Sequence, residues 1–107
     1  MKLSDLSQPL VHAAIEATNA RDPQAWYALF ADGATLSDDG TPEDFRQWSE
    51  NELFGPSQTR ITAIHSEEQN GTVIHADLHS DHWGDFQTFW KFTLANGRIT
   101  RLEVGQE

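Results

Sequence analysis

The chain has 107 residues, enough for one domain with a single core over residues 1–107, and it carries a net charge of −10 at pH 7. This charge opposes binding to nucleic acid or to an anionic membrane surface, and the absence of cysteine excludes disulfides, thiol catalysis and cysteine-based zinc sites. The sequence shows neither a signal peptide nor a stretch apolar enough to span a bilayer, so we expect a cytoplasmic protein.

The first predicted element is a helix that has Ser7 as its cap and Pro9 in its opening turn. One face of this helix carries small or apolar side chains at helical spacing, namely Leu10, Val11, Ala14, Ile15 and Thr18. The helix has to end before Pro23, because a proline pushes the preceding residue out of the helical conformation.

A second, aromatic helix is predicted to begin at Pro23, with Asp22 as its cap. Its apolar face carries Trp26, Leu29 and Phe30. We expect Asp32-Gly33 to end it, because glycine tolerates the left-handed conformation found at helix C-termini.

A short strand over residues 34–36 then leads to Asp38, beside the aromatic helix. Two interpretations are open. Asp38 is a reactive carboxylate at the rim of a pocket, or it belongs to a solvated turn that follows a core helix. In both, Asp39 should point away from the pocket and lie on the surface.

A third helix is predicted to start within residues 41–44, where Thr41 supplies a capping hydroxyl and Pro42 lies in the first turn. It carries Phe45, Trp48 and Leu53, and it ends at Gly55-Pro56.

From Thr59 onward apolar and polar residues alternate, which is typical of half-buried strands. Asn70-Gly71 and Asn96-Gly97 each predict a tight turn between neighbouring strands, and residues 81–85 form a longer loop. Helices followed by an antiparallel meander predict an α+β fold, with three N-terminal helices packed on one face of a mainly antiparallel sheet.

The alternation divides the predicted sheet into two faces. The inner face, which should meet the helices, carries Ile74, Ala76, Leu78, Thr88, Trp90, Phe92 and Leu102. The outer face carries His75, Asp77, His79, Phe89 and Lys91. We expect part of the outer face to form a homodimer interface, since a single layer of helices leaves it uncovered.

The outer face also raises the alternative of a metal site. His75, Asp77 and His79 share this face, and imidazole and carboxylate ligands suit zinc or another divalent ion. Their spacing is that of any polar strand face, so polar residues at a dimer interface are the preferred interpretation. We therefore predict no metal and no cofactor.

Two runs of residues carry a resemblance to a known superfamily: Asn19-Ala20-Arg21-Asp22 and the segment from Ala28 to Asp38. They resemble the nuclear transport factor 2-like superfamily, and within it the branch of SnoaL-like polyketide cyclases and ketosteroid isomerases. The resemblance extends over residues 9–104. It implies a cystatin-like cone in which three helices close a curved sheet around an apolar pocket, with pairing of two chains through the outer sheet face.

The resemblance implies a catalytic role for Asp38, which matches the carboxylate that moves a proton between two substrate carbons in the isomerases. The position of the tyrosine that donates a hydrogen bond to the substrate oxygen holds Ala14 here. The second donor falls at about Thr88, which offers an ordinary hydroxyl. Because such donors stabilise the transition state strongly, we do not expect steroid isomerisation.

The predicted pocket-lining residues are Val11, Ala14, Trp26, Phe30, Trp48, Ile74, Ala76, Leu78, Thr88, Trp90, Phe92 and Leu102. Trp83, in a polar loop, is expected to be a lid over the pocket or a contact across the dimer. The predicted function is binding of a small cyclic or planar carbonyl compound, with isomerisation, dehydration or cyclisation through Asp38 as general base. Thr88 or ordered water would assist as a weak hydrogen-bond donor. The alternative is a non-catalytic module for ligand binding or dimerisation.

Overall fold

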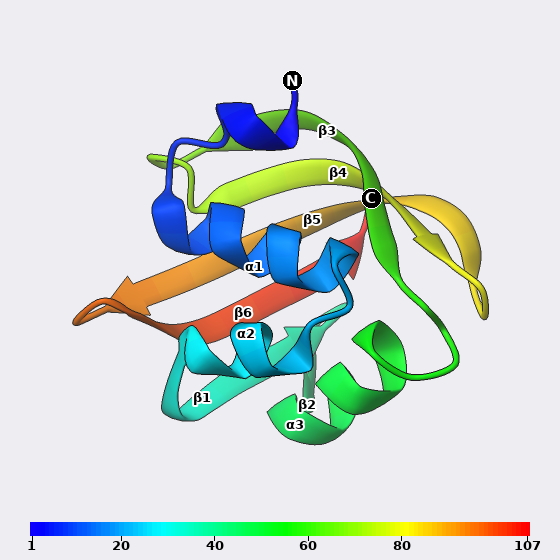
Figure 1. The fold of residues 1–107 in the computed structure, drawn as a ribbon, viewed down its shortest axis with the longest axis horizontal. Helices are drawn as coiled ribbons and strands as arrows, with labels where there is room; N and C mark the ends of the chain where they lie inside the picture. Colours follow the sequence, from blue (N-terminus) through cyan, green and yellow to red (C-terminus); the bar gives the residue numbers. More distant parts are fainter.

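Six strands form one sheet in the computed structural model, which describes residues 1–107 (Figure 1). The strands are β1 (Phe30–Asp38), β2 (Thr41–Glu43), β3 (Arg60–Glu68), β4 (Val73–Ser80), β5 (Gly84–Ala95) and β6 (Arg98–Gln106). They lie in the order β2-β1-β6-β5-β4-β3, and β1 and β6 form the one parallel pair. The predicted mainly antiparallel sheet is confirmed.

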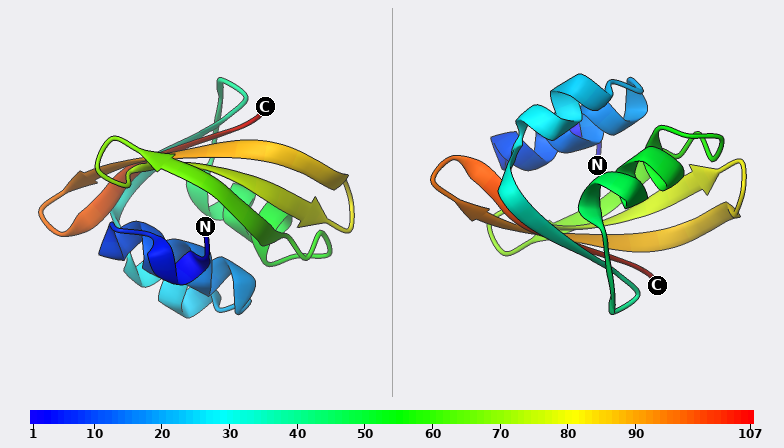
Figure 2. Two further views of the ribbon diagram at one scale, coloured as in Figure 1. Left: turned by 90° about the horizontal axis from the view of Figure 1, so that it is seen from above. Right: turned by 90° about the horizontal axis from the view of Figure 1, so that it is seen from below.

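The helices lie on one face of this sheet (Figure 2). They are α1 (Pro9–Asn19), α2 (Pro23–Ala28) and α3 (Phe45–Trp48), and α3 continues into a π-helical turn over Ser49–Leu53. A 3-10 turn over Leu3–Asp5 precedes α1. Figures 1 and 2 show α1 and α2 side by side and α3 apart from them, toward the end of the sheet where β2 lies. The predicted α+β fold with helices on a curved sheet is confirmed.

α1 begins at Pro9 as predicted, but a different residue caps it. The side-chain Oε1 of Gln8 accepts the backbone N–H of Leu10 at 3.0 Å. The hydroxyl of Ser7 instead donates to a carboxylate oxygen of Glu67, at 2.8 Å, and so connects the start of the helix to β3. The prediction of Ser7 as the cap is wrong because the helix begins at Pro9, which puts Gln8 rather than Ser7 at the N-cap position.

α2 is shorter than predicted. Asp22 caps it as expected, but the helix ends at Ala28, before the predicted stop at Asp32-Gly33. Phe30 already belongs to β1 and pairs with Ile99 of β6. Strand pairing therefore replaces the last helical turn, and Gly33, with φ of +77°, lies where the pairing of β1 with β6 shifts register.

Residues 41–43 form β2 rather than the first turn of the third helix. They pair with β1 through a turn at Asp39-Gly40, whose φ angles are +50° and +83°. An Asp-Gly pair favours such a hairpin turn. α3 begins at Phe45 instead, and Asp44 caps it by accepting the backbone N–H of Gln47 at 2.8 Å.

The core lies between the helices and the inner face of the sheet. All the predicted inner-face side chains are buried, namely Ile74, Ala76, Leu78, Thr88, Trp90, Phe92 and Leu102. α1 and α2 contribute Val11, Ala14, Ile15 and Trp26 to the same core. The predicted outer-face residues remain half-buried or exposed, so the division into two faces is confirmed. Every helix here is too short or too polar to traverse a bilayer.

Candidate functional site

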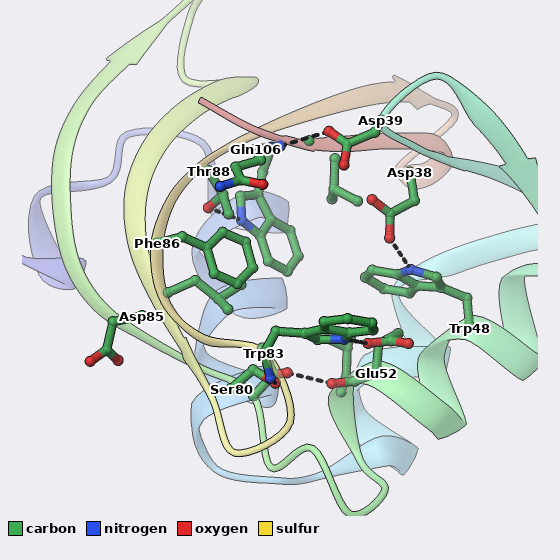
Figure 3. Close-up of a pocket in the computed structure, with 16 residues that line it drawn as sticks. Asp38, Asp39, Trp48, Glu52, Ser80, Trp83, Asp85, Phe86, Thr88 and Gln106 are labelled. Atoms are coloured by element: carbon green, nitrogen blue, oxygen red, sulfur yellow. Dashed lines mark hydrogen bonds between the residues drawn. The ribbon is translucent and has the colours of Figure 1, made fainter.

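A cavity of about 450 Å³ opens between α3 with its following turn, the end of β1, the hairpin that joins β4 to β5, and the end of β6 (Figure 3). Four aromatic side chains line it, and they are Trp48, Trp83, Phe86 and Trp90. Four carboxylates also line it: Asp38, Asp39, Glu52 and Asp85. The volume is that of a small-molecule site, which typically measures about 300–1,000 Å³.

Asp38 reaches the cavity because it is the last residue of β1, where it pairs with Val104 of the parallel strand β6. Its Oδ2 accepts a hydrogen bond from Nε1–H of Trp48 at 2.9 Å. The residue is half-buried, and Oδ1 accepts no hydrogen bond from the protein. One oxygen therefore holds the carboxylate in place while the other faces the cavity.

α3 is held so that Trp48 can contact both the carboxylate and the sheet. The neighbouring residue, Ser49, accepts Nε1–H of Trp26 at 3.1 Å and donates to the backbone carbonyl of Phe45 at 2.8 Å. The ring of Trp48 lies edge-on to that of Trp90, with 6.5 Å between centroids. The indole wall of the cavity is thus fixed from two elements.

Thr88 lines the cavity from β5, but its hydroxyl already donates one hydrogen bond and accepts another within the protein. The hydroxyl donates to the carbonyl of Ala76 at 3.2 Å and accepts Nε1–H of Trp90 at 3.0 Å. This arrangement leaves Thr88 no hydrogen to donate to a ligand. The expected weak donor therefore serves to orient Trp90.

Asp39 lies exposed on the surface, as the sequence predicted, but it also lines the cavity. Its Oδ1 accepts the backbone N–H of Gln106 at 2.8 Å, and its own N–H donates to the carbonyl of Val104 at 2.9 Å. Because the left-handed backbone at Asp39 turns the chain toward β6, its exposed side chain lies over the end of that strand (Figure 3).

Trp83 lies at the tip of the hairpin between β4 and β5 and forms part of the cavity wall (Figure 3). The residue is 62% exposed, and its Nε1–H donates to Oε2 of Glu52 at 3.0 Å. The hydroxyl oxygen of Ser80 accepts its backbone N–H at 3.1 Å. This exposed indole is thus held beside the cavity, and both predicted roles, a lid and a contact across the dimer, stay predictions.

The structure brings together five of the residues predicted to act on a ligand. The cavity is lined by Asp38, Trp48, Leu78, Thr88 and Trp90. The other predicted residues lie in the core away from this cavity, and they are Val11, Ala14, Trp26, Phe30, Ile74, Ala76, Phe92 and Leu102. α1 and α2 pack directly on the middle of the sheet, and this cavity lies at the end of the sheet beyond them. Phe30 lines a second, smaller hollow between α2, the start of β1 and the start of α3.

Several lining residues were absent from the sequence-based set, although the strand period pointed to three of them. Ser80, Phe86 and Gln106 continue the inner-face alternation of β4, β5 and β6 toward the strand ends. Glu52 carried no such signal, because its place depends on the π-helical turn after α3. The side-chain amide of Gln106 makes no hydrogen bond within the protein, so it is free to bind a ligand.

The outer-face histidines each bind carboxylates. His75 contacts Glu68 at 2.5 Å and Glu107 at 2.6 Å, and these two hydrogen bonds raise its pKa above the usual value of 6.5. His65 binds Asp77 at 2.8 Å.

His79 is likewise hydrogen-bonded to two carboxylates, those of Asp81 and Asp85. Hydrogen bonds to Asp81 and then Asp85 raise the pKa of His79 in the same way as for His75. The structure gathers no group of three or more histidines and carboxylates that could hold a metal ion, so His75, Asp77 and His79 do not form the alternative metal site.

The comparisons with known proteins bear on the fold. No protein-family model matches the sequence, and no curated protein matches it. A candidate polyketide cyclase from Sinorhizobium meliloti has a similar structure, with a TM-score of 0.78 at 21% identity over 97% of this chain and 99% of that protein. A nuclear transport factor 2-like protein of unknown function from Cytophaga hutchinsonii gives a TM-score of 0.73 at 16% identity, over 100% and 91% of the two chains.

A candidate ketosteroid isomerase from Kribbella flavida is also similar, with a TM-score of 0.72 at 13% identity over 96% of this chain and 78% of that protein. A further similar structure is described as a cystatin fold. At these identities the likeness establishes the fold alone. The chain therefore has the cystatin-like fold of nuclear transport factor 2-like proteins, as its sequence resemblance predicted.

Proposed function

We propose that this protein binds a small cyclic or planar carbonyl compound in the cavity and catalyses a proton transfer on it, with Asp38 as general base. Isomerisation, dehydration and cyclisation all begin by removing a proton from a carbon next to a carbonyl group. The proposal agrees with the names of similar structures, which include candidate polyketide cyclases and a candidate ketosteroid isomerase.

The position of Asp38 carries the proposal. One carboxylate oxygen is held by Nε1–H of Trp48 at 2.9 Å, and the other faces an aromatic cavity of about 450 Å³. A general base needs this combination of a fixed orientation and a free oxygen within reach of the substrate.

Gln106 is the best-placed partner for the carbonyl oxygen of the substrate. Its side-chain amide lines the same cavity, and its N–H groups are not used within the protein. A hydrogen-bond donor at the carbonyl oxygen stabilises the negative charge that develops there when the proton leaves. We assign this role to Gln106 because the hydroxyl of Thr88 already donates to Ala76.

The alternative proposal is a binding module without catalysis. The position matching the tyrosine donor of the isomerases holds Ala14, which is fully buried in the core rather than at the cavity. Without that donor the same cavity would bind a ligand and leave it unchanged.

Deuterium exchange distinguishes the two proposals. We would screen small cyclic enones, lactones and aromatic ketones by thermal shift, where a ligand at a hundred times its dissociation constant adds about 2.7 kcal/mol of stability. Bound compounds would then be tested by NMR for exchange of the proton beside the carbonyl with deuterated water. We expect Asp38→Asn to retain binding, since asparagine keeps an oxygen for Trp48, and to slow exchange by about 100-fold or more.

The matched control is Glu16→Gln, which removes the same charge from an exposed site on α1 that is remote from the cavity residues. It should retain both binding and exchange. Wild-type protein that binds these compounds without accelerating exchange would support the non-catalytic alternative.

We also propose that two copies of the chain pair through the outer sheet face. This face has no helix over it, and Phe89 lies half-buried on it beside Gly105. Light scattering at micromolar concentration should give the mass of two chains. The mass of a single chain would contradict the proposal.

A further inference from the structure

The charges around the cavity are unbalanced. Its lining residues include four carboxylates and no lysine, arginine or histidine. One of the four, Asp85, pairs with His79 at 2.6 Å, and Figure 3 shows it turned away from the other lining side chains. The remaining three therefore determine the charge of the cavity, and the net charge of −10 on the chain strengthens their negative potential.

These three carboxylates have only neutral partners. Asp38 accepts from the indole of Trp48 at 2.9 Å, and Glu52 accepts from the indole of Trp83 at 3.0 Å. Asp39 accepts from a backbone N–H at 2.8 Å. None of the three forms an ion pair within the protein. A cation that entered the cavity would thus meet carboxylates whose charge nothing in the protein neutralises.

The aromatic wall suits the same kind of ligand. The π-face of an indole attracts a cation more strongly than that of tyrosine or phenylalanine does. Trp48 and Trp83 each donate N–H to a carboxylate, which fixes the orientation of the ring and polarises it toward greater electron density on its face. An alkylammonium group is attracted both to the π-face of an indole and to a carboxylate, and this cavity offers both.

The two ends of the cavity differ. Figure 3 shows Asp38 and Asp39 at one end and Glu52 with Trp83 at the other. At the second end Oε1 of Glu52 accepts no hydrogen bond from the protein, and Trp83 is 62% exposed. Both groups are accessible to a ligand that enters from solvent.

We propose that the cavity selects an organic cation, namely a protonated amine on a small aromatic or apolar body, and that Glu52 and Trp83 hold its ammonium group. The inference rests on the proposed function in locating the ligand in this cavity. It adds the charge class of that ligand. When the ammonium group is bound at the end with Glu52, the apolar body of the ligand extends through the cavity to Asp38 at the other end.

The cation also fits the proton transfer. Removing a proton from carbon places negative charge on the carbonyl oxygen and neutralises Asp38, which takes the proton, so the carboxylates of Asp39 and Glu52 remain to oppose that charge. A positive group on the same substrate offsets this repulsion. A neutral or anionic substrate would lack this compensation.

Three probes of similar shape test the inference: 2-phenylethylammonium, 2-phenylethanol and 3-phenylpropanoate. Binding is measured by calorimetry, and the indole N–H signals of Trp48 and Trp83 in NMR spectra report whether the probe occupies the cavity. We expect the ammonium compound to bind the wild-type protein at least about tenfold more tightly than the alcohol. The carboxylate should bind most weakly.

Glu52→Gln should reduce the advantage of the ammonium compound over the alcohol to about threefold or less, because it removes a charge while keeping an oxygen for Trp83. The matched control is Glu50→Gln, in the same turn but exposed and outside the cavity lining, and it should retain the full advantage.

Ionic strength gives a second measurement that needs no variant. Raising it from about 0.01 M to about 0.15 M should weaken binding of the ammonium compound and leave binding of the alcohol unchanged. Equal affinities for ammonium and alcohol, or tighter binding of the carboxylate, would overturn the inference while the carbonyl compounds still bind. If no compound of either set changes the indole signals, the inference and the proposed function both fail.

Discussion

At the scale of single residues, hydrogen bonds from the indole N–H groups fix the orientation of all four tryptophan side chains. Each one donates to a side chain: Trp26 to Ser49, Trp48 to Asp38, Trp83 to Glu52 and Trp90 to Thr88. No buried side-chain polar atom is left without a partner. The aromatic rings are therefore oriented as well as packed, which is what a cavity of defined shape requires.

Ser49→Ala tests this organisation. It should lower the free energy of unfolding by about 1–3 kcal/mol, because the indole N–H of Trp26 loses its buried acceptor. Thermal denaturation should show a melting temperature lower by several degrees. The control is Ser66→Ala on the exposed side of β3, which should change the melting temperature little. Equal stability of the two variants would contradict this account.

At the scale of elements, α3 is the shortest of the three α-helices, and it carries Trp48 to the site. It spans only Phe45–Trp48 before the π-helical turn, and so short a helix has little stability of its own. The Asp44 cap stabilises the helix itself, and the hydrogen bonds and burial of Ser49 and Trp48 attach it to the rest of the protein. Because Asp38 depends on Trp48 for its orientation, the base depends on this helix.

Asp44→Ala should lower the free energy of unfolding by about 1 kcal/mol, because the backbone N–H of Gln47 loses its cap. The same variant should weaken ligand binding, since α3 carries Trp48 to the cavity. Asp44→Asn, which can still cap, should keep both properties near those of the wild type. Thermal denaturation and calorimetry measure the two effects. A stable Asp44→Ala protein with unchanged binding would show that packing alone places α3.

At the scale of the whole molecule, acidic side chains outnumber lysine and arginine by 17 to 7, and the outer face offsets part of this excess with histidines. Hydrogen bonds to carboxylates raise the pKa of His75 and of His79 above the usual value of 6.5. A raised pKa in the folded state means that folding favours the protonated form. The resulting stability is complete below about pH 6.5 and is lost as the pH rises through the folded-state pKa.

We therefore expect the melting temperature to fall as the pH is raised from about 6 to about 8, a range in which histidine is the main side chain to titrate. The double variant with His75→Gln and His79→Gln should show a flatter profile over the same range. NMR titration of the imidazole signals would measure both pKa values directly. A wild-type profile as flat as that of the double variant would contradict the prediction.

Local chemistry in the sequence was enough for the main elements and the two sheet faces. Proline after a capping aspartate predicted α2, Asn-Gly pairs predicted the hairpin turns, and alternation predicted which residues of β4 and β5 are buried. These features depend on residues close together in the chain. Asp38 was predicted at the end of the first strand for the same reason, and it lies at that position.

Only the tertiary structure decided where the open volume lies. Eight predicted ligand residues are in the core because α1 and α2 pack on the middle of the sheet, a closeness that depends on how side chains from distant segments fit together. Phe30 belongs to β1 rather than to the helix because it pairs with β6, and the turn at Asp39 places a second carboxylate beside the cavity. Glu52 and Trp83 also meet only in three dimensions, across a separation of 31 residues. The sequence by itself thus determined the fold class and the candidate base, and long-range packing decided the shape and charge of the site.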